Sequence, residues 1–203
     1  MKAGEPWKDI RHQLLAMAEE DLRVRTELAS EGSLFDGYHP RMRAVHDANA
    51  TRLWSILRRF GWPGAPRVGL DGAKAAWLIV QHAIAQPAFQ REALEALRQA
   101  AARGEVPAIQ PAMLEDRVRT LEGRPQRYGT QFDWDGSGAL TPLPIEDPEG
   151  LDERRRAVGL EPLEEAMRVR REAAAAEGEL PPSDWSARRL RMDEWLREVG
   201  WRS

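Results

Sequence analysis

A glutamine and a histidine interrupt an apolar run at residues 77–87, WLIVQHAIAQP. Buried polar groups require hydrogen-bonding partners, so Gln81 and His82 indicate a polar interior site. An imidazole titrates near neutral pH, which makes His82 a candidate general acid or base. The alternative is that His82 is a hydrogen-bonded core residue without a chemical role.

Other polar residues supply the groups that such a site needs. We interpret Asp116 and Tyr128 as further catalytic candidates, with Asp116 or Asp147 orienting the second imidazole nitrogen of His82. The candidate substrate-binding residues have directional donors, acceptors or a guanidinium group, and they are Gln81, Arg117, Gln126, Gln131, Asp147 and Arg154. Together they can bind an anionic or amide-bearing molecule and move a proton.

Structural roles explain some of these residues equally well. Asp116 and Arg117 can lock a helix to a hairpin, because a buried ion pair need not be catalytic. Asp147 precedes Pro148, and this order is most simply a helix N-cap.

Metal and nucleotide motifs have no clear match in the chain. The segment DWDGSG begins like a calcium loop, but the twelfth position counted from Asp133 is Pro144 instead of glutamate. A hairpin turn at Asp135 is therefore the preferred interpretation. The four histidines, which match no zinc motif such as HExxH, are His12, His39, His46 and His82. GxSxG, P-loop and GxGxxG motifs are also lacking, so the sequence predicts neither a metal nor a cofactor.

Helical periodicity predicts most of the elements that position these residues. The predicted helices are one that follows Pro6 and reaches Leu28, residues 40–60, 71–86, 87–103 and 111–121, a short helix from about residue 147, residues 161–177, and a last helix with Trp185, Leu196 and Val199. The helix over residues 71–86 is apolar nearly all round, which marks it as the central one.

Two of the apolar stripes contain a polar residue at an inward position. Asp21 fills a gap in the first, and it is interpreted either as an inward acid or as half of an intrahelical pair with Arg25. Asn49 fills the gap in the second, where it either contacts a ligand or ties down neighbouring backbone.

Glycine and proline break the helical pattern over residues 126–148. Two short runs at about residues 128–134 and 139–145 flank DGSG and predict a β-hairpin. We therefore expect a mainly α, helical bundle-like single domain with one small β-hairpin and a C-terminal helical extension. Residues 1–177 form the predicted main domain, and residues 178–203, after the linker GELPPSD, form the predicted tail.

Composition limits the classes of function. The chain has 203 residues, 42% hydrophobic and 31% charged, as is typical of a globular protein. Its net charge of −3 argues against nucleic-acid binding. No segment approaches the roughly 18 apolar residues of a membrane helix, and the lack of cysteine excludes thiol chemistry. We expect a cytoplasmic protein with neither nucleic acid nor membrane as partner.

Several short motifs follow one another along the chain in a specific order. They are GWP at 61–63, WLIVQHA at 77–83, LEDR at 114–117, QRYGTQ at 126–131, PIEDP at 144–148, and RR at 154–155 followed by GL at 159–160. In this order the chain resembles a family of uncharacterised bacterial proteins, classified as a domain of unknown function, over about residues 8–165. The resemblance implies no established activity.

Two hypotheses about function follow from these residues. The favoured one is a small cofactor-independent enzyme that uses acid/base or hydrolytic chemistry on a polar or anionic small molecule or peptide. The alternative is a non-catalytic module with a structural polar core, which binds a ligand or, through Trp185 and Trp195 of its C-terminal helix, a protein partner. Inward polar residues on several elements favour the enzyme. In that case we expect the following residues to converge at one cavity: His82, Asp116, Arg117, Tyr128, Gln131 and Asp147.

Overall fold

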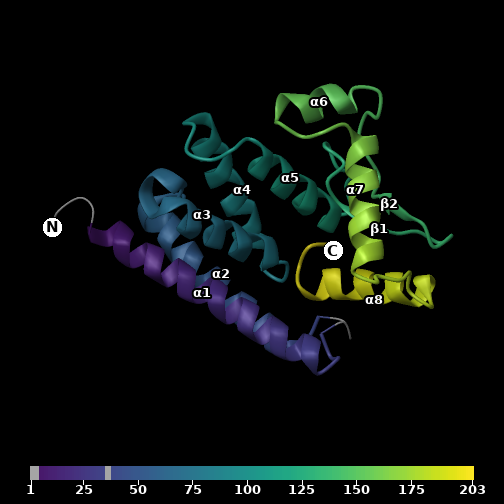
Figure 1. Cartoon of the computed structure of the whole chain (residues 1–203), viewed down its shortest axis with the longest axis horizontal. Coiled ribbons are helices and arrows are strands. Elements are labelled where there is room, and N and C mark those ends of the chain that lie inside the picture. Colours follow the sequence, from purple (N-terminus) through teal and green to yellow (C-terminus); the bar gives the residue numbers. More distant parts are fainter. Residues whose placement is uncertain (1–4, 35–37) are drawn as a thin grey trace. The chain divides into compact units, whose positions relative to one another are not determined.

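The computed structural model describes residues 5–34 and 38–203, and these residues fold mainly into α-helices (Figure 1). The described part contains eight helices, the last of which is the C-terminal helix, and one small antiparallel hairpin, as predicted. The chain divides into two compact units, residues 1–106 and residues 107–203. Each unit is described by itself below.

Unit 1 is a bundle of four helices. They are α1 (Glu5–Ser30), α2 (Pro40–Phe60), α3 (Ala65–His82) and α4 (Pro87–Ala102). Helix α1 packs against α2 and α3, and α2 also packs against α3 and α4. Fully buried side chains from all four helices form the core, among them Leu14, Leu53, Ile79 and Phe89. Proline near the first position favours the starts of α2 and α4, because its missing N–H would have no helical partner there.

Helix α3 differs from its prediction at both ends. It starts at Ala65 instead of Asp71, but Gly69 interrupts it with φ 74° and ψ 169°. Asp71 then accepts a hydrogen bond from the backbone N–H of Gly72 at 2.8 Å, so the polar residue marks the kink. The helix ends at His82 instead of Gln86, with Ala83 as its C-cap. Gln86 itself has non-helical dihedrals, as is usual for a residue that precedes proline.

Unit 2 contains the hairpin and the remaining helices. Its elements are α5 (Ile109–Leu121), β1 (Phe132–Trp134), β2 (Leu140–Pro142), α6 (Leu151–Ala157), α7 (Leu163–Ala176) and α8 (Trp185–Glu198). The strands pair with Asp133 opposite Thr141. They are shorter than the predicted runs, since Pro142 and Pro144 have no N–H to continue the ladder.

The hairpin turn is held by its own side chains. Asp135 Oδ1 accepts hydrogen bonds from Ser137 N, Ser137 Oγ and Ala139 N at 2.6–3.0 Å. Asp133 forms an ion pair with Arg188 of α8 at 2.8 Å. These contacts confirm the hairpin turn that we preferred over a calcium loop.

The predicted tail packs within unit 2. The indole N–H of Trp185 donates to the carbonyl of Trp134 in the hairpin at 2.7 Å. Leu196 and Trp201 are buried, and Arg202 donates to two carbonyls at the end of α5. Residues 178–203 therefore contribute to the packing of this unit.

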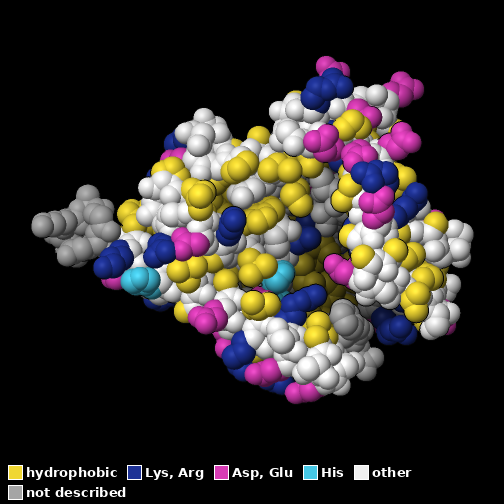
Figure 2. Space-filling model, viewed as in Figure 1, with side chains coloured by type: hydrophobic (Ala, Val, Ile, Leu, Met, Phe, Trp, Pro, Cys, Tyr) yellow, Lys and Arg dark blue, Asp and Glu magenta, His cyan; other side chains and the backbone are white. Residues whose placement is uncertain are grey.

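Charged side chains of both signs are mixed over the face shown in Figure 2, with apolar side chains between them. Such mixing differs from the basic stripe that nucleic-acid-binding proteins present. Among the described residues, none of the helices combines the length and the apolar character that crossing a membrane requires.

Candidate functional site

Three helices of unit 1 bring a carboxylate and two imidazoles together, and we call Asp21, His46 and His82 the DHH cluster. His82 Nδ1 lies 2.8 Å from Asp21 Oδ2, and His46 Nε2 lies 3.2 Å from the same oxygen. The centroids of the two imidazole rings are 5.0 Å apart. These residues come from α1, α2 and α3, so the cluster exists only once the bundle has folded.

The helical stripes explain why these side chains meet. Asp21 follows Leu14 by seven residues on α1, and His46 follows Met42 by four residues on α2, which places each on the buried face of its helix. His82 is the last residue of α3 and retains an exposed fraction of 28% for its side chain. The cluster thus extends from a buried carboxylate to a partly exposed imidazole.

The carboxylate at the centre of the cluster is ionised at neutral pH. Burial alone would raise the pKa of Asp21, but the short contacts and charges of His46 and His82 hold it well below its usual range. Because an ionised carboxylate only accepts hydrogen bonds, His82 Nδ1 must be the donor. In the neutral imidazole this leaves the lone pair on Nε2, the nitrogen that does not face Asp21.

His46 is supported by a tyrosine on its other side. The hydroxyl of Tyr38 and Nδ1 of His46 share a hydrogen bond of 2.7 Å, and their rings stack. Burial, with the nearby charge of Asp47, raises the pKa of Tyr38, so its phenol remains neutral. His46 Nε2 is buried and, although it lies near Asp21, it has no hydrogen bond of good geometry.

Other polar residues of unit 1 form structural contacts. Asn49 donates from Nδ2 to the carbonyl of Met17 at 3.2 Å, so it ties backbone down as one interpretation predicted. Gln86 donates to Asp47 Oδ1 at 2.8 Å. Gln81 is half-buried beside the last residue of α3.

Asp116, a predicted catalytic residue, locks helix α5 to the segment before the hairpin. Its fully buried carboxylate accepts from the backbone N–H groups of Arg127, Tyr128 and Thr130 at 2.6–3.1 Å. The hydroxyl of Thr130 donates to it as well, at 2.9 Å. Tyr128 contributes its backbone N–H to these contacts. The contacts of Asp116 agree with the structural interpretation given above, a lock between a helix and the hairpin.

Two predicted substrate-binding glutamines belong to the same network. Gln126 is fully buried, donates to the carbonyls of Gln131 and Leu143, and accepts from the N–H of Gln131. Arg117 donates from Nε to Gln131 Oε1 at 3.3 Å. Burial lowers the pKa of Arg117 to about 10, which leaves the guanidinium charged at neutral pH.

Arg154 and Asp147, two further predicted substrate-binding residues, form an ion pair in unit 2. Arg154 Nη1 lies 2.8 Å from Asp147 Oδ2, and the guanidinium also donates to the carbonyls of Arg127 and Glu146. Asp147 adopts a positive φ of 45°. The predicted N-cap role of Asp147 is wrong, because Gly150 occupies the N-cap of α6.

The arginine next to Arg154 was missed by the sequence analysis. Arg155 is 2% exposed and donates to the carbonyls of Tyr128, Gly129 and Glu161. Burial lowers its pKa. No local pattern distinguishes two adjacent arginines, and only the packing of α6 shows which one is buried.

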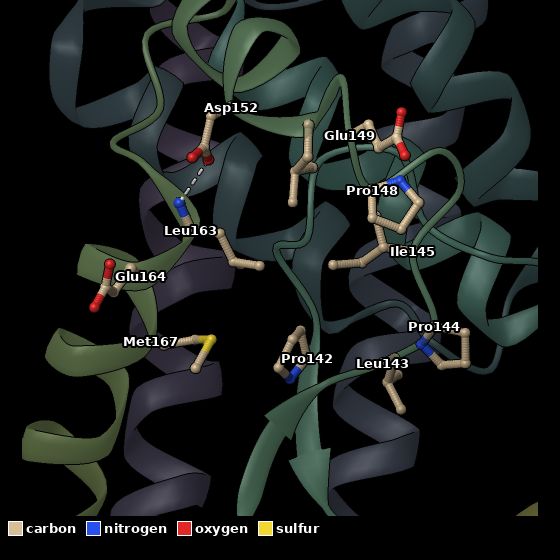
Figure 3. A pocket seen from close by; sticks show the side chains of 11 residues that line it. Pro142, Leu143, Pro144, Ile145, Pro148, Glu149, Asp152, Leu163, Glu164 and Met167 are labelled. Carbon is tan, nitrogen blue, oxygen red and sulfur yellow. Dashed lines mark hydrogen bonds between the residues drawn. The ribbon is translucent and has the colours of Figure 1, made fainter.

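A pocket of about 500 Å³ lies in unit 2 and is shown in Figure 3. Apolar side chains of residues 142–151 and of Leu163 and Met167 line it, together with the acids Glu149, Asp152 and Glu164. Acidic side chains at an apolar pocket do not favour an anionic ligand. None of the predicted site residues lines this pocket.

The structure therefore places the predicted site residues in two groups. Gln81 and His82 belong to unit 1, whereas the other seven belong to unit 2, where hydrogen bonds join most of them to one another. Their convergence at one cavity stays a prediction. The carboxylate that contacts His82 is Asp21, which was interpreted as an inward acid or as half of a pair with Arg25 but was not assigned to His82.

His46 was missed as a site residue because we tested the histidines for spacing along the chain alone. A better signal was available, since His46 lies on the inward face of its helix, three residues before Asn49.

A comparison with protein-family models matches residues 8–177 to a family of unknown function, DUF6624. Comparisons with curated proteins and with solved structures gave no match.

Proposed function

The chain belongs to the DUF6624 family, whose function is unknown, and we propose that it is a small enzyme with its reaction centre at the DHH cluster. The reaction is acid/base or hydrolytic chemistry on a polar or anionic small molecule or peptide. The observation that supports this most is the contact of 2.8 Å between the ionised Asp21 and the partly exposed His82.

A carboxylate that accepts from one imidazole nitrogen prepares the other nitrogen for proton transfer. It fixes the tautomer and the orientation of the ring, and it stabilises the imidazolium that forms when the ring takes up a proton. In this arrangement Nε2 of His82 takes a proton from a water or a substrate hydroxyl. Asp21 stays ionised throughout, as its lowered pKa requires.

The unit 2 residues that we had assigned to catalysis support a different role. The carboxylate of Asp116 is occupied by N–H and O–H groups of residues 127–130. Its negative charge is balanced by those donors, so it stabilises the fold instead of orienting His82. This leaves the DHH cluster as the place where a catalytic imidazole has its carboxylate.

The test is turnover of a substrate panel by matched variants. The purified parent protein is assayed on carboxylic esters, amides, short peptides and phosphate esters. The variants His82→Gln, Asp21→Asn and His12→Gln are then assayed on the same substrates. His12 is an exposed histidine of α1 outside the cluster, and it serves as the control. We expect kcat/KM of the two cluster variants to fall at least about 100-fold, the low end of general acid–base catalysis. The His12→Gln control should keep the kcat/KM of the parent. Equal activity in all four proteins would contradict the proposal.

A second candidate function, binding of a protein partner through the C-terminal helix, is favoured by exposed apolar side chains. Leu180, Leu190 and Met192 have exposed fractions of 81%, 65% and 42%. Exposed apolar groups gathered on one segment can mark a contact surface.

The expectation that the protein is cytoplasmic stays a prediction.

A further inference from the structure

The donor atoms of the DHH cluster are the kinds that a transition metal ion prefers. They are one carboxylate oxygen, Asp21 Oδ2, and two imidazole nitrogens, His46 Nε2 and His82 Nδ1, all within 4.8 Å of one another. Asp21 Oδ2 lies 2.8 Å from His82 Nδ1 and 3.2 Å from His46 Nε2. Bonds of about 2.0–2.2 Å to a tetrahedral ion would place such donors about 3.3 Å apart. Small side-chain rotations would therefore bring these atoms to ligand positions.

His46 supplies a second observation, because its contact with Asp21 is not a well-directed hydrogen bond. Its side chain is 9% exposed, and its buried Nε2 atom lies 3.2 Å from Asp21 Oδ2 without the geometry of a hydrogen bond. Buried polar atoms that lack a well-directed hydrogen bond are rare in folded proteins. A cation held between Asp21, His46 and His82 would satisfy that nitrogen.

The group behind His46 has the arrangement that metal ligands need. A ligating histidine commonly donates its second N–H to an oxygen, which fixes the ring and raises its basicity. Tyr38 places its hydroxyl oxygen 2.7 Å from Nδ1 of His46, so Nδ1–H can donate there while Nε2 keeps its lone pair for the ion. Tyr38 is therefore a positioning residue for the same site.

We propose that the DHH cluster binds one divalent transition metal ion, with zinc the first candidate, through Asp21 Oδ2, His46 Nε2 and His82 Nδ1. Imidazole and carboxylate donors suit zinc and its neighbours, whereas calcium and magnesium prefer oxygen donors alone. Three protein ligands leave a fourth position open, as in catalytic zinc sites. This replaces the sequence-based expectation of no metal, for which only spacing along the chain had been considered.

The inference rests on the proposed function, because it gives the same cluster the means to activate water. When the ion binds, His82 ligates it through Nδ1 and carries its ring proton on Nε2, and Asp21 becomes a ligand instead of a hydrogen-bond acceptor. A water at the open position, which the exposed side of His82 lets solvent reach, would lose its proton more easily and attack an ester, amide or phosphate. The role of base then passes from His82 to the metal-bound hydroxide.

Binding is tested directly on the full chain, without reference to turnover. The protein is freed of metal with a chelator, and Zn²⁺ is titrated in competition with a chromogenic chelator for the parent, Asp21→Asn, His46→Gln, His82→Gln and His12→Gln. We expect one equivalent to bind the parent and the His12 control equally. Each cluster variant should lose more than the roughly 10- to 100-fold that a supporting residue contributes, and Tyr38→Phe should lose that smaller amount. Equal affinities in all variants, or no binding to the parent, would overturn the proposal.

A spectroscopic measurement keeps the test decisive if a cluster variant fails to fold. Co²⁺ is added to the parent and to the His12 control, and its visible absorption reports the donor set. Strong absorption of a four-coordinate ion with nitrogen and oxygen ligands supports the site, whereas the weak spectrum of hydrated Co²⁺ overturns it.

The two proposals can fail separately. Stoichiometric zinc binding without turnover of any substrate would remove the proposed function and retain the metal site. Turnover that survives chelation and depends on His82 would remove the metal site and retain the proposed function.

Discussion

Among single residues, Asp21 is the buried carboxylate that joins the two imidazoles of the DHH cluster. It is 1% exposed, and its two imidazole neighbours compensate for the loss of water around its charge. A buried charge without partners would be strongly unfavourable. The interaction that we had considered for Asp21, a pair with Arg25 on the same helix, involves an exposed arginine and does not supply that compensation.

The lowered pKa of Asp21 predicts how the stability of the metal-free protein depends on pH. In the unfolded chain this carboxyl titrates near pH 3.9, and folding lowers its pKa. Its contribution to stability is therefore complete above about pH 4, and it is lost as the pH falls through the folded value. We expect urea unfolding of the parent, followed from pH 6 down to about pH 2, to show a steeper loss below pH 4 than that of Asp21→Asn. Parallel curves for the two proteins would contradict this role.

Asp116 gives a prediction of a different kind, because its partners are backbone groups. In Asp116→Asn the charge is lost and the side-chain amide places donors against the N–H groups of residues 127–130. We expect a loss of about 1–3 kcal/mol in the free energy of unfolding, measured by urea denaturation. The exposed Glu153 offers a matched control in Glu153→Gln, which should change stability by less than about 0.5 kcal/mol. An unchanged Asp116→Asn protein would show that the lock is not needed.

At the residue scale the sequence indicated some of the side chains that point inward, but it missed His46 and Arg155 and could not indicate partners. His82 and Asp21 were both recognised from gaps in apolar patterns, and they lie 61 residues apart in the chain. Their contact depends on the packing of α1 against α3, which no local pattern encodes. For the same reason Asp116 was assigned to chemistry, although it holds a loop.

At the scale of elements, the helices were predictable because apolar periodicity and proline positions act locally. The predicted helix at residues 40–60 has the bounds of α2, and α4 starts at Pro87 as expected. The strands were predicted too long, since the residues on either side of β1 and β2 are held by the side chains of Asp116 and Gln126. Such side-chain competition with a ladder cannot be seen before the elements are placed.

The kink in α3 yields an element-scale prediction at Gly69. Its φ of 74° lies in the left-handed region, and a Cβ there would lie 3.1 Å from Asp71 Oδ1. We expect Gly69→Ala to lower the free energy of unfolding by more than about 1 kcal/mol, because alanine is strained at positive φ. Gly136→Ala is the control, since Gly136 has no positive φ and its Cβ would meet Trp185 at an ordinary 3.7 Å. Equal stability of both variants would show that the kink is adaptable.

At the scale of the whole molecule, the chain divides into two compact units, and the C-terminal residues belong to the second. Removal of residues 178–203 takes away the buried side chains Leu196 and Trp201. Each contributes about 1.5–3 kcal/mol when fully buried, so unit 2 should lose several kcal/mol. We expect limited proteolysis with mass spectrometry to show cleavage throughout residues 107–177 and protection of the helices of unit 1. Unchanged protection of both units would establish residues 178–203 as a separable tail, as the sequence suggested.

The central claim is that the working site of this protein lies at Asp21, His46 and His82 in unit 1. The most direct measurement is a crystal structure of the zinc-loaded full chain with anomalous diffraction data collected on both sides of the zinc absorption edge. The account predicts one strong anomalous peak with Asp21 Oδ2, His46 Nε2 and His82 Nδ1 at about 2.0–2.2 Å. A cluster without a peak at saturating zinc, or peaks only at the exposed His12 or the half-buried His39, would contradict it.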